Sequence, residues 1–281
     1  MPKIDAIDSG SLYGKKLRPG GGNVELLSRF LVYAVLIIAA LVFLVPFGIM
    51  INTSLKTLAD IRSGTLISLP VELSFEPWGK AWLRLRGYFW NSVRMVVPAV
   101  VISTFIGAVN GYVLSKWRFP GSESFFLALL FGCFIPFQVI LLPMSQTLGR
   151  MGLAESVQGL ILVHVIYGIP FTTLFFRNYY VSIPNAIVES GKIDGAGFFK
   201  IFGRLILPIS GPIIVVAVIW QTTQIWNDFL FGVSFAGSQS QPITVALNNL
   251  VNTSTGVKEY NVDMAGAIIA ALPTLFVYIV S

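Results

Sequence analysis

The sequence predicts an all-α membrane protein with six transmembrane helices. Only 11% of its 281 residues are charged, compared with about 25% in soluble domains. The charges are spaced so that six strongly apolar stretches lack Asp, Glu, Lys and Arg. A helix needs about 20 apolar residues to cross a bilayer, and five of these stretches are that long. Lipid cannot satisfy the open backbone of a strand, and the runs do not alternate as barrel strands do, so helices are the expected spanning form.

The six predicted helices follow one another along the chain. They cover residues 30–55, 95–115, 124–149, 156–176, 205–227 and 264–281. A seventh charge-free stretch, residues 229–257, is rich in Ser, Asn, Gln, Thr and Gly, so we expect a loop there. Before the second span, "PWGKAWLRLRGYFW" mixes Trp, Tyr and Arg, which predicts a helix lying at the membrane interface.

The Lys and Arg residues predict the orientation of the spans. Residues 1–29 are polar and lack the apolar core of a cleaved signal peptide, so they are expected to form a cytoplasmic N-terminal tail. The inner segments then hold 11 Lys and Arg residues and the outer segments 8, or 2 once the interfacial loop is set aside. Both termini are therefore predicted to be cytoplasmic. The net charge of +6 follows from this topology, and no nucleic-acid partner is needed to explain it.

The longest predicted inner loop contains "ESGKIDGAGFFKIFGRLILP", which starts at Glu189. Asp194 is placed to cap a short helix, because its carboxylate can accept from free N–H groups. That helix would carry Phe198, Phe199 and Phe202 on an apolar side. Its apolar side either lies against the inner leaflet or the bundle, or docks into a groove on a soluble partner.

The same segment resembles the EAA loop of bacterial ABC importer membrane subunits. The matching residues are Glu189, Gly195, Leu205, Leu207 and Pro208. The sequence "DGA" is common in the carbohydrate branch, whereas Ser190 and Gly191 replace two alanines and lower the helix propensity. "KWRFPGS", "GLAESVQGLIL", "SIPNAIVE" and "IWNDFLF" extend the likeness over nearly the whole chain, which resembles the smaller permease subunit of maltose-type importers. "VALNNLVN" and "GVKEYNVDMAGAIIAALPT" look like glucose and mannose permeases. Family members usually continue with a basic tail beyond the sixth span, whereas this chain stops at "VYIVS".

The resemblance implies the type I ABC importer permease fold in a bacterial inner (cytoplasmic) membrane. Residues 30–281 would form the permease domain, with a cytoplasmic coupling loop at about residues 179–208. The chain would be one subunit of an ATP-driven sugar importer. The implied substrate is a monosaccharide such as glucose or mannose, with maltose, trehalose or another oligosaccharide as the alternative.

The resemblance also implies partners and a division of labour. The expected partners are a second homologous permease, an ATPase homodimer, a periplasmic or lipid-anchored sugar-binding protein, and membrane lipid. ATP and Mg would belong to the ATPase, because this chain has no G-x-x-x-x-G-K-[S/T] loop. No cofactor and no enzymatic activity are therefore expected of this chain.

The residues assigned to ATPase coupling by the resemblance are those of the EAA-like segment. They are Glu189, Ser190, Gly191, Asp194, Gly195, Ala196, Phe198, Phe199, Phe202, Leu207 and Pro208. Gly195 would let a partner's backbone approach closely, and Glu189 would pair with a cation on the ATPase or stabilise the turn of the loop.

A polar stripe on the fifth predicted span suggests where a sugar passes. Trp220, Gln224 and Asn227 recur at helical spacing, with Gln221 beside them. Amide groups and an aromatic face suit a sugar, but uncharged polar residues in membrane helices also hold helices together. Gln138, in the third predicted span, is a second candidate with the same two interpretations.

Other polar or small residues in the spans are expected to be structural. His164 has no evident carboxylate partner within the membrane, and Asp228 is expected at the outer end of the fifth span. Gly107 and Gly111 form a G-x-x-x-G pattern that favours helix packing, and Asn110 beside them is assigned the same role. An ion-driven secondary sugar transporter is a competing class, but it predicts broken-helix repeats and acidic residues within the spans.

Overall fold

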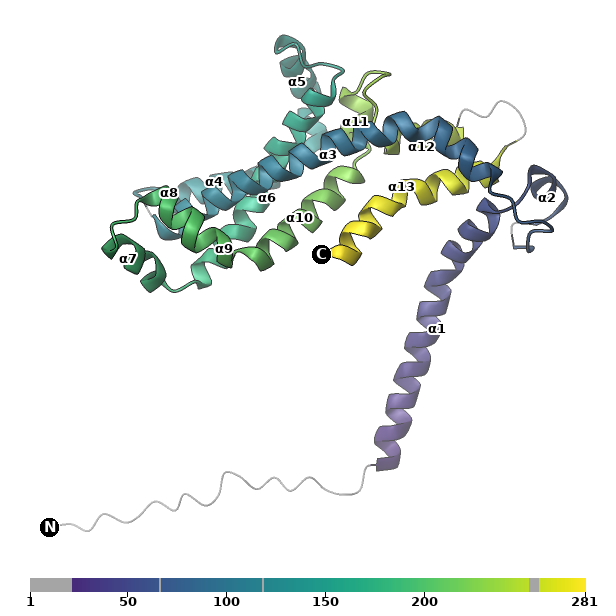
Figure 1. Cartoon of the computed structure of the whole chain (residues 1–281), viewed down its shortest axis with the longest axis horizontal. Helices are drawn as coiled ribbons and strands as arrows, with labels where there is room; N and C mark the ends of the chain where they lie inside the picture. Colours follow the sequence, from purple (N-terminus) through teal and green to yellow (C-terminus); the bar gives the residue numbers. More distant parts are fainter. Residues whose placement is uncertain (1–21, 66, 118, 253–257) are drawn as a thin grey trace. The chain divides into compact units, whose positions relative to one another are not determined.

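The computed structural model describes residues 22–65, 67–117, 119–252 and 258–281, and all regular structure in these ranges is helical (Figure 1). The chain divides into two compact units, Met1–Ile49 and Met50–Ser281. The first unit contains most of α1, Gly22–Ser54, which begins before the predicted start at residue 30. The rest of the predicted tail, residues 1–21, lies outside the described residues.

Four helices of the described chain are long and apolar enough to cross a bilayer, and two bent pairs raise the number of candidate spans to six. The single helices are α1, α3 (Glu76–Lys116), α6 (Val157–Ser182) and α13 (Tyr260–Val280). The six-span, all-α prediction is therefore confirmed, with two of the spans broken.

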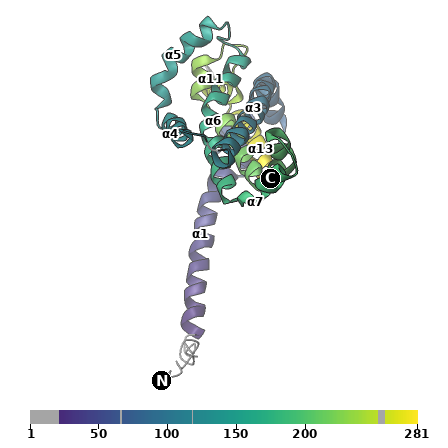
Figure 2. The same ribbon diagram turned by 90° about the vertical axis from the view of Figure 1, so that its left-hand side faces the viewer.

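The third and fifth predicted spans are bent pairs rather than single helices. The helices α4, Ser122–Cys133, and α5, Phe137–Arg150, meet at 96° and run in different directions in Figures 1 and 2. Pro136 explains this break, because its ring fixes φ and disfavours helical backbone at the preceding residue. The segment Phe198–Ile209 meets α10, Gly211–Trp226, at 79°, where Pro212 lacks the N–H that would continue the helix.

The segment before the second span is helical, as predicted, but it is continuous with that span. α3 has 41 residues, so it is about 60 Å long, whereas the hydrocarbon layer is about 30 Å thick. One part of α3 must therefore lie outside the hydrocarbon layer. Its N-terminal part carries Lys80, Arg84, Arg86 and Arg94, which suit the aqueous side of the boundary.

The loop prediction for residues 229–257 is wrong. This stretch contains α11, Leu230–Phe235, and α12, Ile243–Asn252, while residues 253–257 lie outside the described residues. The buried side chains of Phe231, Phe235 and Ile243 explain why helices form in so polar a sequence. Each helix buries an apolar side in the main core and leaves its polar residues outside.

Close contact between α3 and α6 forms the centre of the second unit. A Cβ atom on Gly107 would lie 2.2 Å from Thr172 Oγ1, and one on Gly111 would lie 2.6 Å from Phe176 Cβ. Asn110 Nδ2 donates to Thr173 Oγ1 across the same contact at 3.3 Å. The prediction that these residues serve helix packing is confirmed.

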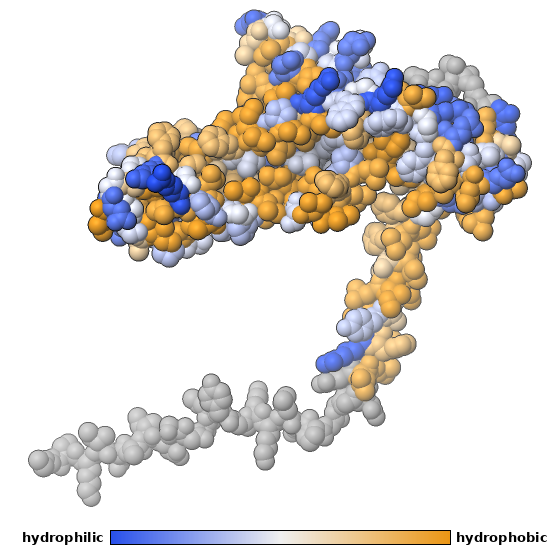
Figure 3. Space-filling model, viewed as in Figure 1, coloured by the Kyte–Doolittle hydropathy of each residue, from blue (hydrophilic) through white to orange (hydrophobic). Residues whose placement is uncertain are grey.

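Polar side chains gather at the ends of the helices. In Figure 3 the visible face of α1 is apolar over most of its length, and hydrophilic residues are visible near α2, Leu58–Ser63, near α7, Asn185–Ile193, and along the upper side of the view around α5 and α11. Many of the large apolar side chains are exposed, which suits contact with lipid or other membrane helices.

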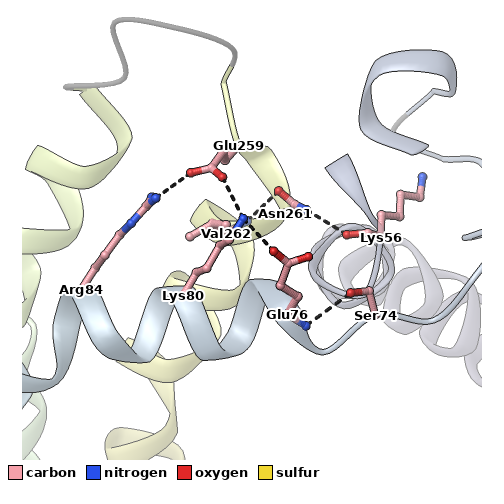
Figure 4. A network of polar contacts seen from close by, with 8 residues as sticks. All are labelled: Lys56, Ser74, Glu76, Lys80, Arg84, Glu259, Asn261 and Val262. Atoms are coloured by element: carbon pink, nitrogen blue, oxygen red, sulfur yellow. Dashed lines mark hydrogen bonds and ion pairs between the residues drawn. The ribbon is translucent and has the colours of Figure 1, made fainter. Parts of the chain in front are cut away.

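One polar network joins the beginnings of α3 and α13 (Figure 4). Glu259 accepts a hydrogen bond from Arg84 at 2.8 Å and lies 3.5 Å from Lys80 Nζ. The neighbouring Asn261 donates to the carbonyl of Lys56 at 2.8 Å. The hydrogen bond from Arg84 lowers the pKa of the Glu259 carboxyl.

The α3–α6 contact predicts that Gly107→Ala destabilises the protein. The added methyl would meet the backbone of Thr172 as well as its side chain, and overpacking of this kind costs about 1–3 kcal/mol. Thermal unfolding in detergent should show a lower midpoint. Gly87→Ala is the matched control on the same helix, because a Cβ there meets no atom within 4 Å. Equal midpoints for the two variants would contradict the packing role.

The Glu259 network predicts a pH-dependent effect of Glu259→Gln. Because the folded protein lowers the pKa of this carboxyl, its stabilisation is present above the ordinary pKa of about 4.3 and is lost as the pH falls through the lowered value. At pH 7 the variant should be less stable by up to about 1 kcal/mol. The measurement is the difference in unfolding midpoint between the wild type and Glu259→Gln, taken at pH 7 and at acidic pH. Glu72→Gln, at an exposed position, is the control. A difference of the same size at both pH values would refute the stabilising role of the Glu259 carboxylate.

Candidate functional site

A cavity of about 580 Å³ lies between α6, α10 and α11, with the α4–α5 bend on one side. Trp220, Gln221, Gln224 and Asn227 all line it, so the structure brings the predicted stripe together at one cavity. Gln138 is exposed at the beginning of α5 and does not line the cavity, although Phe137 does. The role of Gln138 in a substrate path stays a prediction.

Trp220 belongs to an aromatic wall. Its ring centroid is 6.2 Å from that of Phe171 and 5.9 Å from that of Phe175, both on α6. Gln224 and Asn227 continue the exposed stripe toward the end of α10. This arrangement places an aromatic surface beside amide donors and acceptors.

Gln221 differs from its neighbours because its amide holds two helices together. The side chain is buried, and Nε2 donates to Ser103 Oγ on α3 at 3.1 Å. Gly168 on α6 makes room for it, since a Cβ there would lie 2.1 Å from Gln221 Nε2. Of the two interpretations of the stripe, helix association therefore describes Gln221.

His164 is a cavity residue that the sequence analysis assigned to structure alone. It is buried, and its Nε2 lies 3.7 Å from Asp228 Oδ2. Both side chains line the cavity. The expectation that His164 lacks a carboxylate partner is wrong, because the turn after α10 brings Asp228 back toward α6. The position of Asp228 directly after the stripe was the available sequence signal.

Asp228 is held in place by the backbone that follows it. Its Oδ1 accepts from the N–H of Phe231 at 3.4 Å and its Oδ2 from the N–H of Gly232 at 3.2 Å. The Asp228 carbonyl accepts from Thr244 Oγ1 at 2.6 Å. Burial raises the pKa of the Asp228 carboxyl, while the backbone N–H groups act in the opposite direction.

The EAA-like segment forms α7, α8 (Phe198–Ile201), a π-helical turn at Phe202–Ile206 and α9 (Leu207–Ile209). Asp194 does not cap α8 as predicted; it lies at the C-terminal end of α7, and α8 begins after Gly197. The turn between the helices requires Gly195, whose φ is +73°. The N–H of Ala196 closes the turn by donating to the Gly191 carbonyl at 2.9 Å.

The three phenylalanines of this segment face different surroundings. Phe198 and Phe202 pack on Tyr112, at centroid distances of 5.0 and 5.3 Å. Phe199 is 81% exposed, and Ile193 on α7 is 86% exposed. Packing against the bundle thus describes Phe198 and Phe202, while Phe199 and Ile193 are exposed apolar side chains.

The remaining coupling candidates lie around the same turn. Glu189 and Ser190 are exposed on α7, and Glu189 forms no ion pair with any described residue. Gly191 is buried, and a Cβ there would lie 2.9 Å from Leu205 Cδ1, so this small residue lets α7 pack on the following turn. Leu207 is half-buried and Pro208 exposed.

A buried elbow connects the EAA-like segment to the cavity helix. Ser210 lies between α9 and α10, and its hydroxyl is hydrogen-bonded to the Tyr180 hydroxyl at 2.9 Å. Tyr179 Oη donates to the Ile209 carbonyl at 2.8 Å. Both tyrosines belong to α6, so α6 holds the bend from which α10 leads to the cavity.

The bundle of candidate spans, the cavity beside α10 and the structured segment that leads to it are features expected of a permease subunit. The family described as "Binding-protein-dependent transport system inner membrane component" matches residues 20–281, and the chain belongs to this family. The prediction of a transport subunit rather than an enzyme is confirmed by this membership. Membership also implies a multi-pass inner-membrane location and, in general terms, a partner permease, an ATPase and a binding protein.

Individual relatives cover nearly the whole chain. A probable ABC transporter permease protein of Pyrococcus horikoshii is 41% identical over 254 residues, covering 90% of this chain and 92% of that protein. The xylose/arabinose import permease protein of Haloferax volcanii is 33% identical over 276 residues, covering 90% and 89%. A crystal structure of a bacterial ABC transporter involved in alginate import contains a chain with a TM-score of 0.81 at 20% identity, covering 95% of this chain and 98% of that one. The predicted type I importer permease fold is thereby confirmed.

Proposed function

We propose that this chain forms part of the sugar path of an ATP-driven importer and that the cavity beside α10 contacts the sugar. The observation that carries this proposal is that the rings of Trp220 and Phe171 line the cavity next to the amides of Gln224 and Asn227, with Phe175 packed against Trp220. Sugars present C–H faces that pack on aromatic rings and hydroxyls that bond amides. The xylose/arabinose import permease of Haloferax volcanii and the glucose import permease of Saccharolobus solfataricus, the latter 26% identical over 272 residues, support a sugar as substrate.

A monosaccharide such as glucose or mannose is the substrate class we favour. The relatives include permeases named for the import of xylose/arabinose, glucose and α-glucosides. A cavity of about 580 Å³ has room for one or two sugar rings. Maltose, trehalose and other oligosaccharides are the alternative substrates, to be separated by assay.

We propose that the EAA-like segment contacts an ATPase homodimer and transmits to the bundle the conformational change that follows ATP binding. The segment's two exposed apolar side chains, Ile193 and Phe199, are available for a soluble partner to cover. Glu189 is exposed and available for a cation on that partner. In this arrangement the segment and both termini face the cytoplasm, a sugar-binding protein delivers substrate from the opposite side, and ATP and Mg are bound by the ATPase.

Sugar uptake tests the cavity assignment. In proteoliposomes containing the whole importer and its binding protein, we expect ATP-dependent uptake of a labelled monosaccharide. Trp220→Ala should reduce uptake about tenfold, the equivalent of about 1.4 kcal/mol. Trp82→Ala is the matched control, because both tryptophans are 39% exposed and Trp82 does not line the cavity. Equal uptake by both variants would reject the cavity as the sugar path.

Two glycines with positive φ, Gly195 and Gly152, test whether the EAA-like segment couples the chain to the ATPase. Asn tolerates positive φ, so Gly195→Asn should fold and insert normally, yet its side chain would occupy the space into which the ATPase is proposed to dock. Uptake and sugar-stimulated ATP hydrolysis should both be lost. Gly152→Asn is the control, because Gly152 also has positive φ, at +69°, and open space around it. Normal coupled transport by Gly195→Asn would contradict the proposal.

A further inference from the structure

We propose that Asp228 and His164 form a hydroxyl-binding subsite that restricts the cavity to neutral polyhydroxylated ligands and excludes sugar acids. This inference rests on the proposed function, because it names the substrate class of the same cavity. It concerns two side chains outside the aromatic and amide stripe.

The first argument is an unsatisfied buried nitrogen at the cavity. His164 is only 5% exposed, and its Nε2 has no hydrogen-bond partner in the described chain. The nearest acceptor group, Asp228 Oδ2, is 3.7 Å away, which is too far for a hydrogen bond. Leaving a buried polar atom unpaired is costly, so a third group placed between the two side chains would satisfy Nε2, which itself has almost no accessible surface.

A ligand hydroxyl has the right chemistry to join the two side chains. A hydroxyl is both a donor and an acceptor, and an oxygen about 2.8 Å from each of two atoms fits when those atoms are 3.7 Å apart. The hydroxyl would donate to Asp228 Oδ2 and accept from His164 Nε2–H. Asp228 is already fixed by the N–H groups of Phe231 and Gly232, so the movement that lets the hydroxyl reach the covered Nε2 falls on the His164 ring.

The charge of the cavity would select neutral sugars over sugar acids. Among the described residues that line it, Asp228 is the carboxylate, and neither Lys nor Arg is present. A sugar acid would bring a second negative charge into a partly buried site without a cation to pair with it. Like charges in such a site repel strongly, and a built-in repulsion is an effective way to reject a ligand.

The single cysteine of the chain provides a direct probe of occupancy. Cys133 lines the cavity, so a bound ligand should slow its alkylation by a maleimide. The assay uses the purified whole importer at pH 8 and quantifies the Cys133 peptide by mass spectrometry. The probes are D-glucose, D-xylose and maltose, and D-glucuronate as the acid that differs from D-glucose at one carbon.

For the wild type we expect protection by a neutral sugar and none by D-glucuronate at the same concentration. Asp228→Asn should let D-glucuronate protect Cys133. The ratio between the concentrations of D-glucuronate and D-glucose that give half-maximal protection should fall at least about tenfold, as expected for a lost charge interaction. Asn is itself a good capping residue, so the beginning of α11 is retained. His164→Gln should weaken protection by the neutral sugar about tenfold, the loss expected for one hydrogen bond to a charged network. Glu72→Gln removes the same charge at an exposed site outside the cavity and should match the wild type.

The outcomes separate this inference from the proposed function. If neutral sugars protect Cys133 but Asp228→Asn still excludes D-glucuronate, the subsite is refuted while the sugar path stands. Equal protection of Cys133 in the wild type by D-glucose and D-glucuronate would also refute the subsite and leave the sugar path standing. If none of the neutral sugars protects Cys133 in the wild type, the proposed sugar path itself fails. Unfolding midpoints of the purified variants confirm that each comparison is made between folded proteins.

Discussion

The close packing of α3 against α6 is the constraint on which the rest of the second unit depends. Between membrane helices there is little hydrophobic driving force, because lipid is as apolar as the helices, so fit and polar contacts decide which helices associate. Gly107 and Gly111 let the two backbones approach, and Gly168 admits the amide that attaches α10 to α3. α6 is thereby fixed as the common wall of the cavity and support of the elbow at Ser210.

The two broken spans place irregular backbone where it is useful. Lipid cannot satisfy a free N–H or C=O, so a break is tolerated only where protein or water can reach it. The α4–α5 break contributes Cys133, Ile135 and Phe137 to the cavity wall. The second break lies at Ser210, whose hydroxyl also bonds the Ile206 carbonyl at 2.6 Å. Each break therefore adjoins one of the two candidate functional regions.

Hydropathy was enough to predict six candidate spans and the helical class. A charged residue is costly in lipid, so the absence of charges marks each span directly in the sequence. It could not predict the bends, since Pro136 breaks its helix while Pro98 remains inside α3. The helices α11 and α12 were missed because burial of a few apolar residues outweighed a polar composition. His164 and Asp228 are far apart in sequence and meet only through tertiary structure, so the place of Asp228 after the stripe was visible in the sequence but its approach to His164 was not. The charge network at the beginnings of α3 and α13 adds a similar case, joining Arg84 to Glu259.

The same packing that builds the cavity also gives the EAA-like segment a rigid path to it. Phe198 and Phe202 are anchored on Tyr112 of α3, and Ser210 is anchored on Tyr180 of α6. A force applied at the exposed Phe199 would therefore act on the bundle through packed side chains and hydrogen bonds, without a flexible linker to absorb it. Because α10 begins at this elbow and carries Trp220 and Gln224, a rotation of the elbow would reorient the stripe relative to α6. On the proposed function, a change in the ATPase would thus alter the contacts that hold the sugar, and no reactive group in the segment would be required.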